Sequence, residues 1–351
     1  MRRCAVHQSI VRGAIALALI LTLFLFRPAA AEPQTRAAVA EAVAARLQAE
    51  YVFVDKGAKA ARLVRSRAKS GVYDKAPSEK AFVEALTADL YSVTQDKHLV
   101  VRYSAAGYPA LGAAVADDPA ARAAEVLAMR RSNFSMPKAE VLDGNVGYFR
   151  IKLFQAPQDA GPTLVAAMNF LANTDALIFD LRDNGGGDAA TVALALSYLT
   201  PPQTQFVSYR DRAGKEAQSW SVPYAPGAPW STTRPVYVLI NGKTFSAAEE
   251  FAYDLQQLKR GTIVGARSRG GANPGLILRL SEHYAMFVPN EAAVGPLSGG
   301  NWEGVGVAPD VPVDPAQALP TAHRLALQAL LAKADSADKP ELEEALKRLG
   351  E

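Results

Sequence analysis

Cysteine and histidine are scarce in this sequence of 351 residues. The single cysteine is Cys4, close to the start of the chain, and there are only four histidines. One early cysteine cannot form an internal disulfide or a cysteine-ligated zinc site, and the metalloprotease spacing H-E-x-x-H is also absent. Cysteine catalysis is excluded as well, and we expect neither a metal nor a cofactor.

Residues 1–31 have the pattern of a secretory signal peptide. Arginines precede the apolar run 13–26, and the small-residue end Ala29–Ala31 follows it. Because the run is short for a membrane span, we predict cleavage after Ala31 and export to the periplasm or the medium. The alternative is an uncleaved anchor. Beyond this segment we expect no membrane contact.

The charge balance changes when this segment is removed. Residues 1–31 hold four arginines and no acidic residue, so the formal net charge falls from +3 to −1. The remainder lacks the clustered lysine and arginine surface on which nucleic-acid binding depends. We therefore expect no nucleic-acid partner.

The rest of the chain divides into four regions by its apolar periodicity. Residues 32–103 have a helical pattern and predict a small N-terminal domain. Residues 104–136 are rich in alanine, glycine and proline and predict a connector. Strand and helix patterns alternate over 137–315, which indicates a layered α/β core, and 316–351 has the pattern of a helical tail.

Two strand-to-helix junctions carry the chemistry of this core. In the first, the buried strand pattern 176–181 runs into the sequence DLRDNGGG, which ends at Gly187. Consecutive glycines permit positive φ angles and present bare N–H groups at a helix start, where an anion is favoured. A tight turn without a ligand is the alternative. A dinucleotide site is disfavoured because the spacing G-x-G-x-x-G is not met.

The second junction places Ser246 where a strand turns into a helix. The N–H of Ala247 would lie beside its hydroxyl, so that a nucleophile and an oxyanion donor stand together, as acyl transfer requires. A capping box formed with Glu249 is the structural alternative, and it stays open. The surrounding residues do not form the G-x-S-x-G elbow, because Thr244 and Ala248 occupy the glycine positions.

A nucleophilic serine needs a base, and His98 is the candidate. It lies at the end of the helical domain, where it could face a cleft, whereas His283 and His323 lie in a strand-like stretch and in the terminal helix. The alternative for His98 is an ordinary, partly buried histidine.

Several long motifs together resemble one protease family. DLRDNGGG, TFSAAEEFAYDLQ, IVGARSRGGANPG and NWEGVGVAPDVPV occur in this order and resemble the tail-specific (carboxy-terminal processing) serine proteases. With YVFVDKGAKAARLV and DKHLVV ahead of them, the chain looks most like bacterial members akin to interphotoreceptor retinoid-binding protein. The resemblance implies a crotonase-like core of ββα units, a helical N-terminal domain closing over the active site, and hydrolysis of peptides or unstructured protein segments.

The resemblance also assigns roles to individual residues. Ser246 matches the family nucleophile, and Gly186 and Ala247 match the positions whose N–H groups form the oxyanion hole. Better-known members pair the serine with a lysine, but the matching position here is Gly271, so that dyad is not available.

A tricorn-like branch of the family uses a histidine and a late glutamate instead, which fall on His98 and Glu303. The residue before that histidine is a serine in tricorn and serves as a relay, whereas here it is Lys97. Lys97 could pair with Glu303 or compete as a base.

Two other functions stay open on the same fold. One is a non-catalytic carrier of an apolar, retinoid-like or lipid-like ligand, and the other is a structural envelope protein that binds a partner's tail. Fold alone does not separate them from a peptidase. The sequence predicts no particular oligomeric state.

Overall fold

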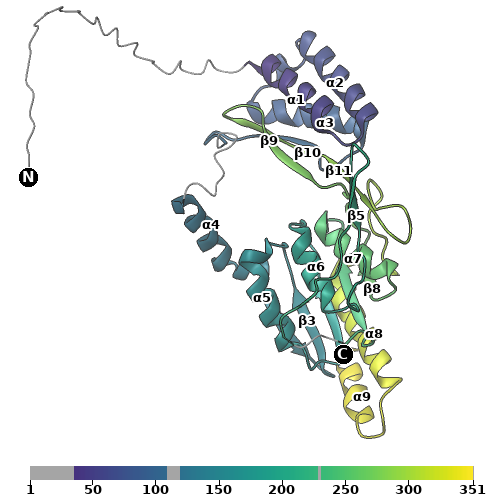
Figure 1. Ribbon diagram of the computed structural model, residues 1–351. Coiled ribbons are helices and arrows are strands. Elements are labelled where there is room, and N and C mark those ends of the chain that lie inside the picture. Colours follow the sequence, from purple (N-terminus) through teal and green to yellow (C-terminus); the bar gives the residue numbers. More distant parts are fainter. Residues whose placement is uncertain (1–34, 109–118, 228–230, 351) are drawn as a thin grey trace, which may run out of the picture. The chain divides into compact units, whose positions relative to one another are not determined.

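The computed structural model describes residues 35–108, 119–227 and 231–350 (Figure 1). The predicted signal peptide, its cleavage site and Cys4 lie outside these residues, as does part of the predicted connector. Within the described ranges, no helix is both long and apolar enough to cross a membrane.

The described chain begins with three helices. These are α1 (Arg36–Glu50), α2 (Val54–Lys69) and α3 (Glu79–Thr94), with a 3-10 turn at Tyr73–Lys75 before α3. The hydroxyls of Thr35 and Ser78 accept hydrogen bonds from the backbone of the first turns of α1 and α3, which satisfies otherwise unpaired N–H groups. The apolar face of α1, including Val43 and Leu47, is buried as its spacing predicts.

A hairpin from much later in the chain completes the core of these helices. Strands β9 (Gly275–Arg279) and β10 (Tyr284–Pro289) form an antiparallel sheet with β1 (Val100–Tyr103), in the order β1-β10-β9. Met286 and Val288 of β10 belong to the same buried cluster as Leu47 and Leu86 of the helices. Sequence periodicity predicts that β9 and β10 are strands. It does not predict that they pair with β1 in a sheet of their own rather than join the main sheet.

The main sheet has six strands in the order β12-β8-β7-β4-β3-β2. All neighbours are parallel except β2, which is an antiparallel edge. The strands are β2 (Lys138–Leu142), β3 (Val146–Arg150), β4 (Ala176–Asp180), β7 (Val236–Ile240), β8 (Thr262–Gly265) and β12 (Val311–Pro312). β4 and β7 are buried along their whole length, as expected for apolar strands covered on both faces.

Helices cover both faces of this sheet. On one face α5 (Pro157–Phe170), α6 (Ala189–Ser197) and α7 (Ala247–Gln257) pack with Leu177 and Phe179 of β4. On the other, α8 (Ala318–Leu331) and α9 (Lys339–Arg348) pack with Ala176 and Ile178, the alternate residues of the same strand. The predicted α/β class with a helical N-terminal region is confirmed.

The remaining elements are short. A second small sheet has the order β11-β5-β6, and helix α4 precedes β2. Their bounds are Glu291–Val294 for β11, Ser208–Asp211 for β5, Glu216–Ala217 for β6 and Pro119–Arg131 for α4, with 3-10 turns at Asn133–Ser135 and Pro315–Gln317.

The order of the main sheet brings the two predicted junctions together. β4 and β7 are parallel neighbours, with Asp180 paired to Leu239 near their carboxyl ends. The loop after β4 leads to α6 and the loop after β7 leads to α7. Because carboxyl ends of neighbouring parallel strands share one edge, the glycine turn and Ser246 lie side by side there.

Candidate active site

Ser246 stands at the start of α7 in an uncommon backbone conformation. Its φ is 57° and its ψ is −127°, and such strain in a residue other than glycine costs of order 1–3 kcal/mol. Hydrogen bonds on both sides hold it: the Phe245 N–H donates to the carbonyl of Asn184 at 3.0 Å, and the Ser246 N–H donates to Glu249 Oε2 at 2.9 Å. The capping interaction with Glu249 is therefore compatible with a nucleophilic role.

Glu249 ties this turn to a second loop. Its side chain is fully buried. Besides the bond from Ser246, the carboxylate accepts hydrogen bonds from the N–H groups of Gly270 at 2.6 Å and Gly271 at 2.9 Å and from the hydroxyl of Ser268. Burial raises the pKa of this carboxyl, while the four donors favour its ionised form. Sequence reasoning identified Glu249 only as a helix cap, although here it joins two loops.

Gly186 packs directly against Ser246. Its φ is 107°, and a Cβ added there would lie 2.7 Å from Ser246 Cβ and 3.1 Å from the Ala247 nitrogen. Only glycine permits this approach. The Gly186 N–H donates to Asn184 Oδ1 at 2.8 Å, so it is engaged inside the protein in this conformation. Ala247 is the first residue of α7, where N–H groups have no partner within the helix.

His98 reaches the site from the turn between α3 and β1. Its ring lies 4.4 Å from the ring of Phe245 and is stacked 5.5 Å from that of Phe287. Only 8% of His98 is exposed. Burial, and then the charge of Arg269, lower the pKa of His98 to about 4, so the ring is neutral near neutral pH. Among the described residues, no hydrogen bond joins His98 to the Ser246 hydroxyl.

Glu303 lies beside His98, although more than two hundred positions separate them in the sequence. Side-chain ligand atoms of Asp96, His98 and Glu303 lie within 4.8 Å of one another. Glu303 Oε2 accepts the N–H of Ala272 at 2.6 Å, while Glu303 Oε1 and His98 Nδ1 are buried and have no hydrogen-bond partner. Burial, and then the charge of Asp96, raise the pKa of Glu303 to about 7.

Lys97 has a different partner from the one considered in the sequence. Its ammonium group donates to the backbone carbonyl of Arg269 rather than to Glu303. At Gly271, the position that matches the family lysine, an added Cβ would lie 2.2 Å from Phe245 Cε2 and 2.8 Å from His98 Cε1. The two rings thus fill the space that a side chain at position 271 would need.

Trp302 contacts the loop that contains Gly270 and Gly271. It is buried, and its indole N–H donates to the carbonyl of Gly271 at 2.9 Å. Together with Glu249, it holds Gly271 from both its carbonyl and its N–H. Sequence reasoning did not find this role; the only signal was the position of Trp302 next to Glu303 in the motif NWEG.

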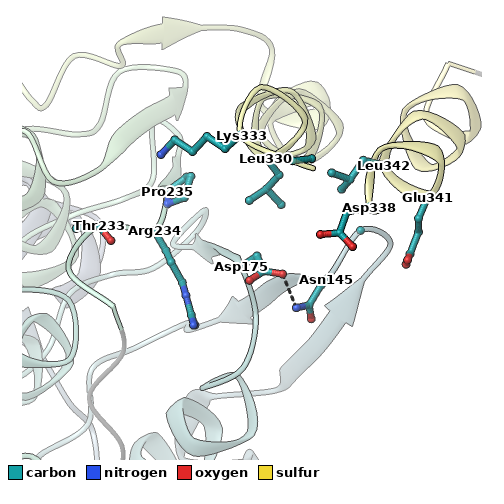
Figure 2. A pocket seen from close by; sticks show the side chains of 12 residues that line it. Asn145, Asp175, Thr233, Arg234, Pro235, Leu330, Lys333, Asp338, Glu341 and Leu342 are labelled. Atoms are coloured by element: carbon teal, nitrogen blue, oxygen red, sulfur yellow. Dashed lines mark hydrogen bonds between the residues drawn. The ribbon is translucent and has the colours of Figure 1, made fainter. Parts of the chain in front are cut away.

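A separate pocket of about 520 Å³ lies at the other end of the main sheet (Figure 2). Asn145, Asp175 and Pro235, which line it, directly precede β3, β4 and β7, whereas Ser246 follows the carboxyl end of β7. In Figure 2 Asn145 donates a hydrogen bond to Asp175 across the floor of this pocket. The pocket is therefore not part of the Ser246 site.

Comparisons with protein families match two parts of the chain. The model for peptidase family S41 matches residues 145–313, and the model for the N-terminal domain of peptidase S41 in eukaryotic IRBP matches residues 32–133. The first match contains Ser246 and Glu303, and the second contains His98.

Individual relatives show the same similarity. The carboxy-terminal-processing protease of Bartonella bacilliformis is 30% identical over 189 residues, which are 52% of this chain and 42% of that protein. The tail-specific protease of Haemophilus influenzae is 35% identical over 128 residues, 36% of this chain and 17% of that protein. The chain thus spans less than half the length of these curated relatives.

Solved structures share the fold. A lipoprotein from Streptococcus agalactiae has a TM-score of 0.56 at 14% identity, covering 85% of this chain and 98% of that one. A putative peptidase from Parabacteroides merdae has a TM-score of 0.53 at 19% identity, covering 80% and 90%.

Proposed function

We propose that this chain, which belongs to peptidase family S41, is a serine-type peptidase that cleaves peptide bonds through an acyl-enzyme on Ser246. The observation that carries the proposal is the positive φ of Ser246 at the start of α7, next to the glycine turn. His98 and Glu303, which come from distant segments, support it by supplying a base and a carboxylate at the same site.

In the proposed reaction, Ser246 Oγ attacks the peptide carbonyl carbon while a ring nitrogen of His98 accepts the hydroxyl proton. The lowered pKa of His98 supports this role, because the neutral ring has a lone pair available. The imidazolium that forms is opposed by burial, so a neighbouring carboxylate must stabilise it, and we assign that role to Glu303. His98 then gives the proton to the leaving amine as the C–N bond breaks, and water hydrolyses the acyl ester.

The negative charge on the carbonyl oxygen needs two donors in this scheme. The Ala247 N–H, at the positive end of the α7 dipole, is one of them. Gly186 can supply the other once its N–H leaves Asn184 Oδ1. We therefore infer that substrate binding exchanges this internal hydrogen bond for one to the substrate.

The substrate class follows from the family and the site. We propose that the enzyme acts on peptides or unstructured protein segments outside the cytoplasm, after removal of residues 1–31, and that it needs no metal for catalysis. A carrier of an apolar ligand would have no use for a cluster of ionisable side chains at this position, whereas Asp96, His98 and Glu303 converge here beside the rings of Phe245 and Phe287.

We also propose the domain plan that the sequence predicts: helical 32–103, connector 104–136, core 137–315 and helical tail 316–351, with the hairpin β9-β10 of the core segment packing on the helical domain. The successive β2-β3-α5 and β4-α6 segments support a crotonase-like organisation of the core.

Covalent labelling tests the nucleophile. The protein without residues 1–31 should react with a fluorophosphonate probe, and Ser246→Ala should not react while melting close to the wild type. Loss of one helix cap costs only about 1 kcal/mol, so unfolding does not explain a loss of labelling. Ser92→Ala, on the exposed face of α3, is the matched control and should label normally. Equal labelling of wild type and Ser246→Ala would exclude Ser246.

A further inference from the structure

The cluster of Asp96, His98 and Glu303 contains two polar atoms that a folded protein rarely leaves unpaired. His98 Nδ1 and Glu303 Oε1 are both buried without a hydrogen-bond partner. Each such atom costs about 1–3 kcal/mol, because it has lost water and gained nothing in return. Both belong to side chains whose ligand atoms lie within 4.8 Å of each other and of an Asp96 oxygen.

The donor set matches one kind of ligand. A histidine nitrogen and two carboxylate oxygens are ligands that zinc takes in proteins, at distances near ~2.0–2.2 Å. Ligands arranged tetrahedrally at that distance lie about 3.4 Å apart, so each pair of ligand atoms, now within 4.8 Å, would need to approach by about 1.4 Å at most. Among the described residues, Asp96, His98 and Glu303 form the single group of histidine and acidic side chains whose ligand atoms are close enough to hold a metal ion.

The electrostatics of the cluster favour a cation. Asp96 and Glu303 bring two carboxyl groups close together in a largely buried place, and a divalent ion would stabilise the charge of both. Tyr51 donates to Asp96 Oδ2 at 3.1 Å and Ala272 donates to Glu303 Oε2, the kind of support that orients metal-binding carboxylates.

We propose that Asp96, His98 and Glu303 form a binding site for a zinc ion, and that zinc bound there inhibits the peptidase. Zinc on His98 Nδ1 leaves Nε2 as an N–H donor, which cannot accept the Ser246 proton. The inhibitory part rests on the proposed function, whereas the binding part does not.

Binding is tested on the Ser246→Ala variant, which keeps the cluster but cannot turn over substrate. After removal of metals, calorimetric titration with ZnCl₂ should show one zinc per chain. Adding His98→Gln or Glu303→Gln should weaken binding by at least about 10- to 100-fold, the range found even for residues that only support ligands. His283→Gln is the matched control, because the ring of His283 is hydrogen-bonded to the carbonyl of Ser104, outside the cluster.

Absorption spectroscopy at the zinc edge needs no further variant and should show one imidazole with oxygen ligands. Absence of stoichiometric binding in Ser246→Ala, or equal weakening by His283→Gln and Glu303→Gln, would overturn the site.

Inhibition is tested on the wild type. The rate of fluorophosphonate labelling and of peptide hydrolysis should fall over the zinc concentrations that fill the site, and EDTA should restore it. Bound zinc that leaves the rate unchanged, or raises it, would overturn the inhibitory part. A wild type that is inactive with and without zinc would instead count against the proposed peptidase, since the binding measurement does not depend on activity.

Discussion

A single methyl group added at Gly271 tests how the site is packed. A Cβ there would lie 2.2 Å from Phe245 Cε2 and 2.8 Å from His98 Cε1, whereas ordinary contacts begin at 3.4 Å. In Gly271→Ala, the Phe245 ring must therefore move by about 1.2 Å and the His98 ring by about 0.6 Å. The two rings pack against each other at 4.4 Å, so neither can move independently.

We expect two separate effects from this substitution. Overpacking should lower the free energy of unfolding by about 1–3 kcal/mol. Displacement of the base by a sizeable fraction of an ångström should lower kcat by about 100-fold, since misplacement near 1 Å is enough for such a loss. Gly271 does not have a positive φ, so backbone strain adds nothing to either effect.

The assay combines urea unfolding with kcat and KM on an unstructured peptide. Gly161→Ala is the control: this glycine is buried within α5, and apart from its chain neighbours nothing lies within 4 Å of the added Cβ. It should leave kcat unchanged, and we expect no gain in stability because Pro162 follows it and disfavours helical backbone in a residue with a Cβ. If Gly271→Ala has the kcat and the stability of the wild type, the rings of Phe245 and His98 are free to move away from the added Cβ, and the argument from packing is refuted.

Two further predictions concern the base and a buried acid. His98→Ala should lower kcat by about 10²–10⁴-fold. Lys97→Ala should lower kcat far less, because the ammonium group of Lys97 donates to a backbone carbonyl. If steady-state rates show the larger loss in Lys97→Ala, the assignment of His98 as the base is wrong. Burial raises the pKa of Glu250, which neighbours the buried carboxyl of Asp254, so the stability linked to this pair is complete below pH ~4.5 and is lost as the pH rises through the raised pKa. Glu250→Gln should remove up to about 3 kcal/mol of that pH dependence, and equal slopes for wild type and variant in urea unfolding between pH 5 and 8 would contradict this.

The elements that hold Ser246 could be predicted because their signals are local. A buried apolar strand, a turn and a helix start place Ser246, and the same logic places the glycine turn after β4. The strand order then follows from parallel α/β packing, which brings the two turns to one edge. His98 was proposed because histidines are few and because it lies at the end of the helical domain, whereas Glu303 was proposed through resemblance alone.

Other parts of the site depend on contacts between distant segments and leave no local signal. Glu249 has the spacing of a helix cap, and nothing in that spacing shows that it also accepts N–H groups from Gly270 and Gly271. The pairing of β10 with β1 is likewise invisible to periodicity, which identifies strands but not their partners. The bond between Gly186 and Asn184 could not be foreseen either, because it depends on one rotamer.

The packing around Gly271 connects the choice of base to the backbone. Phe245 and His98 occupy the volume that any side chain at position 271 would enter, so a histidine at position 98 and a lysine at position 271 compete for the same space. Changing one base for the other therefore requires changes at positions 98, 245 and 271 together. A glycine at position 271 therefore leaves room for the ring of His98. The backbone N–H of Gly271 donates to Glu249, whose carboxylate also accepts the N–H of Ser246. The loop at Gly271 thus contacts the ring of His98 and, through Glu249, is linked to the strained backbone of Ser246.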